Sequence, residues 1–287
     1  MGGVRVRADL AGLAGEGGSG VVPVRLAPRS DATLVRVGAV VVKAHAPGTK
    51  AAALAARLRV AAHPALAGIL LPPLPPARVR ALPGGRSATL WPYGVPVDPG
   101  ADELPWEAAG ALLALLHAVD PAALGPGALP AAGGPTRAAE AVARLRAAPG
   151  AGTADERRAV ERVLAGARAE PARLALCHGD FHFGQLVADP AGGDGLLLID
   201  VDDLGVGDPA WDLARPAAWF AAGLVPEPDW RRFLAGYGVA EPWPDWLDGP
   251  ARALTAQLAA RALLTGRPLS EEGAAFVDAC RRIDALT

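Results

Sequence analysis

Two stretches of polar side chains, each following an apolar run, decide the fold of this chain. The first reads CHGDFHFGQLV (Cys177–Val187) and directly follows the run LALC. The second reads LIDVDDLGVGDPAWDLA (Leu198–Ala214) and begins inside the run GLLLIDV (Gly195–Val201). Because short apolar runs are typical of buried strands, we expect both polar stretches to be loops on a rigid scaffold, where active sites are common.

Three side chains in these loops can supply hard oxygen ligands. Gln185 lies five residues after Asp180, and Asp200 lies 20 residues after Asp180 at the end of the next apolar run. We expect a short hairpin between the two polar stretches to bring the three side chains to one end. Carboxylate and amide oxygens are the ligands that Mg²⁺ prefers and shares with substrate phosphates. The pattern therefore predicts a magnesium site.

A second interpretation of the same loop is a metal-dependent hydrolase, because His178, Asp180 and His182 form the pattern H-x-D-x-H. The chain has only five histidines. His45, His63 and His117 lie in segments that read as a strand end, a helix end and a helix. A histidine-rich zinc site is therefore disfavoured.

Composition excludes several other classes of protein. Of the 287 residues, 51% are hydrophobic and 20% are charged, which is typical of a globular protein of one large or two smaller domains. No apolar stretch reaches the length of about 20 residues that spans a bilayer, and the start MGGVRVRADL does not resemble a signal peptide. We expect a cytoplasmic protein that binds no membrane, in which Cys177 and Cys280 are ordinary core residues.

Charge is divided unevenly along the chain. Residues 1–97 carry a net charge of +9, the remainder carries −11, and the total is −2. A nucleic-acid-binding protein would normally show a dominant basic excess, so the charge argues against nucleic acid as a partner. The chain has 26 arginines and only two lysines, Lys43 and Lys50, and the GC-rich codons of arginine, alanine, glycine and proline explain most of this bias.

The chain reads as a sheet-rich part followed by a helical part. Strands are expected in VVPVRL, ATLVRVG, AVVVKAHA and SATLWPY, and a helix over residues 50–62. After the hinge-like GVPVDPG the pattern becomes helical, at residues 106–119, 136–148 and 154–169 and again from Ala210 onward, with breaks at Pro226–Pro228 and Glu241–Pro250.

The two polar loops resemble the aminoglycoside phosphotransferase family, also called the phosphotransferase enzyme family. That family reads His-Gly-Asp with an Asn five positions after the Asp, then Ile-Asp-aromatic, Gly-Asp-Pro and Asp-Leu-Ala. HGDFHFGQ and LIDVDDLGVGDPAWDLA match nearly position for position. The run ending in His117 and the segment FLAGYG (Phe233–Gly238) resemble further parts of the family. The resemblance implies an α+β, two-lobed protein-kinase-like fold, with a small β-rich lobe over residues 1–92 and a larger helical lobe over 93–287.

The resemblance also implies roles for the loop residues. Asp180 would be the catalytic carboxylate that accepts a proton from the substrate hydroxyl, and Asp200 would hold Mg²⁺ on the nucleotide phosphates. Gln185 stands where most members have Asn, so its longer amide is expected to bind the metal with altered reach. His178 is expected to be a scaffold residue. His182, Asp202 and Asp203 are candidates for contact with the substrate, while Asp208 and Asp212 are expected to be a turn carboxylate and a helix cap that hold the loop in place.

Lys43 would complete the nucleotide site, because the family has a phosphate-binding lysine on its third strand. Trp91, Tyr93 and Val95 would flank the adenine at the hinge. The family pairs its lysine with a glutamate on the following helix, yet no acidic residue occurs between Lys43 and Asp98. The partner is expected to be absent, to be something other than a carboxylate, or to come from Glu16 or Asp31.

The expected function is therefore transfer of the γ-phosphate of ATP or GTP, with Mg²⁺, to a hydroxyl of a small molecule. An antibiotic is the first expected acceptor, since a GC-rich genome is compatible with an antibiotic producer. A metabolite kinase acting on a sugar, choline or homoserine is the alternative within this fold. A nucleotide-binding pseudokinase is the alternative of a different class. The protein is expected to be a monomer or a homodimer.

Overall fold

The computed structural model describes residues 24–26, 32–98, 100–125, 127, 129–167, 173–193, 195–266 and 268–286. These residues form two compact units. We call them the sheet unit, made of the described residues of 1–98, 122–129 and 184–202, and the helical unit, made of those of 99–121, 130–183 and 203–287. The expected Glu16 and Asp31 partners of Lys43 lie outside the described residues.

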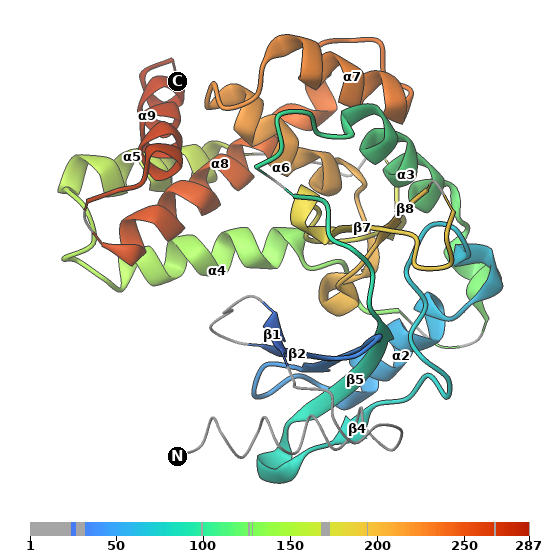
Figure 1. The fold of residues 1–287 in the computed structure, drawn as a ribbon. Coiled ribbons are helices and arrows are strands. Elements are labelled where there is room, and N and C mark those ends of the chain that lie inside the picture. The colour runs from blue at the N-terminus through green and yellow to red at the C-terminus, as the bar shows by residue number, and fades with distance from the viewer. Residues whose placement is uncertain are drawn as a thin grey trace. The chain divides into compact units, whose positions relative to one another are not determined.

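The sheet unit is built around a five-stranded antiparallel sheet in the order β1-β2-β3-β5-β4 (Figure 1). Its strands are β1 (Val24–Leu26), β2 (Thr33–Val37), β3 (Val40–Ala44), β4 (Arg80–Ala81) and β5 (Ser87–Pro92). The β-branched runs that predicted strands are confirmed in β1, β2, β3 and β5, although residues 21–23 of the first run lie outside the described part. The two-residue strand β4 was not predicted, because it has no apolar pattern of its own.

The register of the sheet places the polar residues Lys43 and Thr89 next to each other on neighbouring strands. Lys43 on β3 lies opposite Leu34 on β2 and Thr89 on β5. The strands bury Val35, Val42, Ala44 and Ala88 as a small apolar core. Helix α2 (Ala51–Ala61) follows β3 and lies beside the sheet, as the pattern over 50–62 predicted.

A second, smaller ladder in the sheet unit positions Gln185 and Asp200. Strand β7 (Leu186–Ala188) pairs antiparallel with β8 (Leu196–Leu198). The Ile199 N–H donates to the Gln185 carbonyl at 2.9 Å, so Asp200 emerges from the ladder beside Gln185. Segment 95–97 runs along the other side of β7, where the Val97 N–H donates to Leu186 and the Ala188 N–H donates to Val95.

The short hairpin expected between the two polar stretches is confirmed by the pairing of β7 with β8, but the run LALC is not part of it. Strand β6 (Ala175–Cys177) pairs with β9 (Gly205–Gly207) in the helical unit, whereas β8 pairs with β7 in the sheet unit. Runs of three apolar residues make too few cross-strand contacts to select a partner by pattern alone. The loop after β6 and the loop after β8 therefore belong to different units.

The helical unit contains α3 (Trp106–Ala118), α4 (Gly134–Arg146), α5 (Ala154–Gly166), α6 (Ala210–Ala221), α7 (Glu227–Tyr237), α8 (Asp245–Thr265) and α9 (Glu271–Ala285). Helix α8 packs against α4, α5, α6 and α9 around a core of small and branched side chains. The predicted helices are confirmed, with two corrections to the expected breaks. The break expected at Pro226–Pro228 ends at Pro226, because α7 begins at Glu227 and includes Pro228. The break expected up to Pro250 ends at Pro244, because α8 begins at Asp245 and includes Pro250.

Helices α3 and α7 cross with almost no space between their backbones. A Cβ atom at Gly110 would lie 2.1 Å from the Phe233 carbonyl oxygen, and one at Gly236 would lie 2.0 Å from the Glu107 carbonyl oxygen. Glycine is therefore required at both positions. This close crossing brings His117, near the end of α3, to Tyr237, at the end of α7. None of the helices in the described parts of the chain is long and apolar enough to cross a membrane.

Candidate active site

Lys43 is a buried cation held between two carboxylates of the sheet unit. Its side chain is 7% exposed. The Nζ atom contacts Asp200 Oδ1, and it lies 2.9 Å from Asp202 Oδ2. Burial opposes the charge on the ammonium group, but the two aspartates outweigh burial and raise the pKa of Lys43. The lysine is therefore fully protonated at neutral pH, as a phosphate-binding cation must be.

The second carboxylate beside Lys43, that of Asp202, is the partner that the sequence after Lys43 does not provide. Helix α2 contains no acidic residue, so it cannot supply the glutamate that the family pattern requires. Asp202 supplies a carboxylate to Lys43 instead, from a 3₁₀ turn (Val201–Asp203) that lies 159 residues further along the chain. Sequence reasoning had Asp202 as a substrate residue, and only the lack of acidic residues after Lys43 signalled that a substitute partner was needed.

Asp202 is itself held by a buried polar chain that runs into the sheet. His45 Nδ1 lies 3.0 Å from Asp202 Oδ1, and His45 Nε2 lies 2.8 Å from the Thr89 hydroxyl. The Trp91 indole N–H donates to the same hydroxyl at 2.8 Å. Both His45 and Thr89 are completely buried. Burial raises the pKa of Asp202, but the hydrogen bond with His45 and the charge of Lys43 outweigh it and lower that pKa.

Asp200 has the only positive φ angle among the described non-glycine residues, at 68°. Aspartate tolerates this left-handed conformation better than most residues, and such strain is often found at functional sites. The Gln185 amide lies 3.5 Å from Asp200 Oδ2 and is almost fully buried. One carboxylate and one amide form a donor set of hard oxygens, which fits Mg²⁺ if the Gln185 amide presents its oxygen.

The hinge residues Trp91, Tyr93 and Val95 have clear partners within the sheet unit. Trp91 is buried and donates to Thr89, so its indole supports the chain that holds Asp202. The Arg36 guanidinium covers the Tyr93 ring at 3.4 Å from its centroid. The Val95 side chain is exposed, whereas its carbonyl accepts a hydrogen bond from Ala188. Among the three, Val95 alone presents an apolar side chain to the surroundings.

Asp180 lies in the helical unit between two arginines. Arg215 Nη2 lies 2.5 Å from Asp180 Oδ1, and Arg137 Nη2 lies 3.0 Å from Asp180 Oδ2. Arg137 also forms an ion pair with Asp203. Each oxygen of the Asp180 carboxylate therefore has a guanidinium partner, which fixes the plane of the group. The two arginines come from α4 and α6, and neither was among the residues selected from the sequence.

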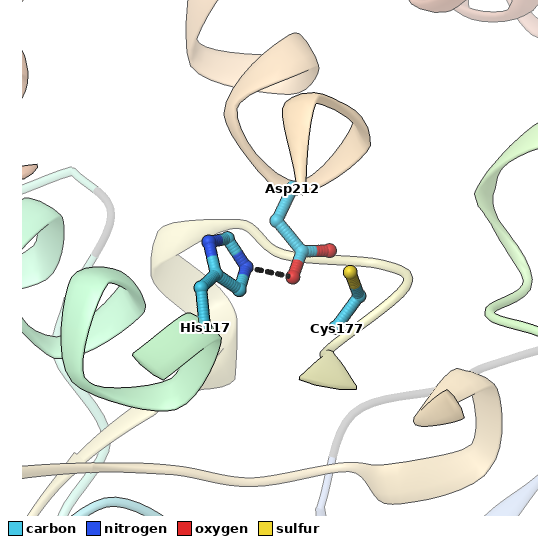
Figure 2. A group of neighbouring side chains, drawn as sticks. All are labelled: His117, Cys177 and Asp212. Atoms are coloured by element: carbon cyan, nitrogen blue, oxygen red, sulfur yellow. Dashed lines mark hydrogen bonds and ion pairs between the residues drawn. The ribbon is translucent and has the colours of Figure 1, made fainter. Parts of the chain in front are cut away.

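The loop that carries Asp180 is fastened to α6 by a fully buried carboxylate, Asp212. Its two oxygens accept hydrogen bonds from the backbone N–H groups of His178, at 2.6 Å, and of Gly179, at 2.7 Å. His117 Nε2 lies 2.9 Å from Asp212 Oδ2, and Figure 2 shows this contact between α3 and α6. Burial raises the pKa of Asp212, but the hydrogen bond from His117 and the neighbouring groups outweigh it and lower that pKa.

His117, Cys177 and Asp212 lie close enough together to suggest a metal site, but their atoms are already used. Asp212 has three hydrogen-bond partners, and His117 Nδ1 lies 2.8 Å from the Tyr237 hydroxyl. Burial raises the pKa of the Cys177 thiol far above neutrality, so this sulfur stays protonated. The cluster in Figure 2 is therefore a structural support for the loop that carries Asp180.

The loop also depends on a glycine before the candidate catalytic residue. Gly179 has a φ angle of +85°, and a Cβ atom there would lie 2.2 Å from the Asp203 carbonyl oxygen. Both facts exclude other residues at this position. The expectation that Asp212 holds the loop in place is confirmed, whereas the helix N–H that a cap would bind, that of Ala210 at the start of α6, donates to Asp208.

His182 lies half-buried between two phenylalanines that anchor the loop. The rings of Phe181 and Phe183 are fully buried, and Phe183 packs edge-on against Trp106 with 4.5 Å between ring centroids.

Of the predicted residues, the sheet unit brings together Lys43, Gln185, Asp200 and Asp202, and the helical unit brings together Asp180 and Asp203 through Arg137. Sequence reasoning missed His45, Thr89, Arg137 and Arg215.

Comparison with known proteins agrees with this geometry. Residues 27–254 match the phosphotransferase enzyme family. No curated protein sequence matches the chain. Among solved structures, aminoglycoside phosphotransferase APH(3'')-Id from Streptomyces rimosus has 23% sequence identity and a TM-score of 0.61, and the match covers 88% of this chain and 98% of that one.

Two further solved structures show the range of similar proteins. A choline/ethanolamine kinase family protein from Mesorhizobium loti has 20% identity and a TM-score of 0.59, with 100% of this chain and 95% of that chain covered. A thermostable mutant of aminoglycoside phosphotransferase APH(4)-Ia, in ternary complex with AMP-PNP and hygromycin B, has 16% identity and a TM-score of 0.64, with 96% and 97% covered. At these identities the likeness shows the fold, which confirms the predicted kinase-like combination of a small β-rich lobe and a larger helical lobe.

Proposed function

The chain belongs to the phosphotransferase enzyme family, and we propose that it transfers the γ-phosphate of ATP or GTP to a hydroxyl of a small molecule in the cytoplasm. The observation that carries this proposal is the buried contact between Lys43 and Asp200. A protonated lysine beside a carboxylate with hard oxygens is the arrangement that binds nucleotide phosphates and their metal ion in kinases. We take residues 1–92 as the nucleotide-binding lobe and residues 93–287 as the catalytic and substrate-binding lobe.

In this proposal the residues of the sheet unit bind the nucleotide. Lys43 contacts the phosphates, and Asp202 keeps its ammonium group in place as the family's helix glutamate does elsewhere. Asp200 and Gln185 would hold Mg²⁺, which would neutralise charge on the phosphates. Trp91, Tyr93 and Val95 border the adenine. Arg36 stacks on the Tyr93 ring and thereby fixes the orientation of that ring.

The residues of the helical unit act on the acceptor. As the acceptor oxygen bonds to the γ-phosphorus, the bond between that phosphorus and the bridging oxygen of ADP breaks, and the hydroxyl proton passes to Asp180. Arg137 and Arg215 hold the two oxygens of Asp180 in a fixed plane, which orients the lone pair that receives the proton. Asp203, joined to Asp180 through Arg137, and His182 are the proposed neighbours of the acceptor.

Antibiotics are the first acceptors to test, and small metabolites are the second. The names of similar solved structures support both, since they include aminoglycoside and macrolide phosphotransferases as well as a choline/ethanolamine kinase family protein. The second class has specific support from the polar cluster around Asp180, which suits a small, highly polar acceptor.

The proposal is tested by measuring ADP or GDP release with Mg²⁺ and a panel of antibiotics, sugars, choline, ethanolamine and homoserine. We expect at least one acceptor to raise release well above the background without acceptor, and ³¹P NMR to show a new phosphate ester. The variant Asp278→Asn, which changes an exposed carboxylate on α9, is the control and should behave as wild type. Nucleotide binding without release for any acceptor would support the pseudokinase alternative and contradict catalysis.

A further inference from the structure

Three helices of the helical unit bring arginines to the loop that carries Asp180. Arg137 lies in α4, Arg215 in α6 and Arg261 in α8, and α8 packs against both of the other helices. Burial and the like charges of Arg137 and Arg215 lower the pKa of Arg261, while Asp180 opposes that shift. The three guanidinium groups and Asp180 are therefore near enough to interact through their charges.

One cation of this cluster, Arg261, has no carboxylate partner among the described residues. Arg137 and Arg215 share two carboxylates, Asp180 and Asp203. Arg261 has an exposed side chain and no ion-pair partner among the described residues.

A buried donor in the cluster also lacks a partner. The Nε atom of Arg215 is inaccessible to solvent and makes no hydrogen bond within the described parts of the chain. Arg215 as a whole is 8% exposed, so this donor cannot turn to water without moving the residue. An unsatisfied guanidinium donor next to an unpaired arginine favours an anionic ligand, because carboxylate and phosphate oxygens match its geometry.

We propose that Arg137, Arg215 and Arg261 form an anion-binding subsite for the acceptor, and that the hydroxylated substrate carries a carboxylate or phosphate group. This inference rests on the proposed function, since it specifies which acceptors the Asp180 loop receives. It predicts a substrate preference opposite to the one that the net charge of the helical part suggests. The −11 charge of residues 98–287 would favour a cation, but the charges nearest to Asp180 are arginines.

The test uses acceptors that share a six-carbon polyol skeleton and differ in charge. Wild-type protein with ATP and Mg²⁺ is given sorbitol, gluconate, sorbitol 6-phosphate or glucamine, together with natural-product antibiotics sorted into acidic and basic groups. We expect ADP release with acidic acceptors to exceed that with their neutral or amine counterparts by at least tenfold. Preference for gluconate identifies a carboxylate site, and preference for sorbitol 6-phosphate identifies a phosphate site.

Arg261→Gln provides the residue-level test, because this side chain has no described ion-pair partner to lose. With the best acidic acceptor we expect KM to rise about tenfold, kcat to stay within twofold, and the KM of ATP to stay unchanged. Arg231→Gln, which alters an exposed arginine on α7, is the matched control and should leave all three values unchanged.

Three results would overturn the inference. They are release by neutral or amine acceptors that equals or exceeds release by acids, no release by any acid, and an unchanged acceptor KM in Arg261→Gln. If neutral or amine acceptors are phosphorylated, the proposed function survives and only the anion subsite fails. If no acceptor of any charge supports release, both fail.

Discussion

The two sets of candidate site residues have central charges of opposite sign, each held between two groups of the other sign. In the sheet unit one lysine lies between two aspartates, Asp200 and Asp202. In the helical unit one aspartate, Asp180, lies between two arginines. The first set has a negative excess and suits a bound cation beside the lysine. The second set surrounds its central carboxylate with guanidinium groups and, in our proposal, suits an anionic group. The same kind of ion pair is thus built around a cation in one unit and around an anion in the other.

The two central charges are also supported in different ways. Lys43 depends on Asp202, and Asp202 depends on a buried chain through His45 and Thr89 into the sheet. The Asp180 loop instead depends on Asp212, which holds the two backbone N–H groups before it. Substitutions in the two sets should therefore have different signatures, in nucleotide binding for the first and in loop stability or acceptor binding for the second.

The largest expected effect is on stability, from Asp212→Ala. The change leaves two buried N–H groups and His117 without their carboxylate. Each buried donor left unsatisfied costs about 1–3 kcal/mol, so we expect a loss of about 3–5 kcal/mol. Chemical denaturation should show this loss in the free energy of unfolding. Asp229→Ala, on the surface of α7, should lose much less. A loss below about 1 kcal/mol for Asp212→Ala would contradict its role as the support of the loop.

The second effect concerns nucleotide binding, from Asp202→Asn. A hydrogen bond to a charged group contributes about 1.5–3 kcal/mol, so the KM of ATP should rise roughly 10- to 100-fold. The KM of the acceptor should stay within about twofold. Steady-state kinetics with each substrate varied in turn measures both values. An unchanged KM of ATP would show that Lys43 does not need this carboxylate.

In the helical unit, the substitution that corresponds to Asp202→Asn is Arg137→Gln. It removes one guanidinium from Asp180 and the partner of Asp203, so we expect the acceptor KM to rise about tenfold, which corresponds to about 1.4 kcal/mol. The KM of ATP should not change. If Arg137→Gln and Asp202→Asn raised the same KM, the two sets of residues would not have the separate roles that their charges indicate.

The smallest effect is the contribution of Asp212 to the dependence of stability on pH. The folded protein lowers the pKa of this carboxyl below its ordinary value of 3.8. Its stabilising contribution is therefore fully present above that value and is lost as the pH falls through the lower, folded-state pKa. Denaturation series in this acid range should show a smaller loss of stability on acidification for Asp212→Asn than for wild type. Equal slopes would contradict the assigned shift.

Much of the fold could be predicted from particular runs of sequence. The β-branched runs around Val35 and Val42 and the helical periodicity from Trp106 onward determine their elements locally. The pairing of β6 with β9 could not be predicted, because runs of three residues leave several partners equally acceptable. The glycines at positions 110 and 236 carry the α3–α7 crossing, but only the structure shows which glycines have that role.

The residues of the candidate site could likewise be predicted only in part from the sequence. Lys43, Asp180 and Asp200 stood out because they fall in a recognisable order beside apolar strands. Asp202 could not be assigned to Lys43 by spacing, because 159 residues separate them. The arginines around Asp180 come from three helices and are hidden among 26 arginines. The net charge is +9 over residues 1–97 and −11 over residues 98–287, whereas the charges nearest to Lys43 are aspartates and those nearest to Asp180 are arginines.

The central claim is that Asp180 acts on the acceptor while the residues around Lys43 bind the nucleotide. The most direct measurement compares turnover and AMP-PNP affinity for Asp180→Asn with those of wild type. We predict that turnover falls by about 10²–10⁴-fold, the usual contribution of a positioned proton acceptor, while the Kd of AMP-PNP stays within about twofold. Turnover close to that of wild type, or a parallel loss of AMP-PNP binding, would contradict the account.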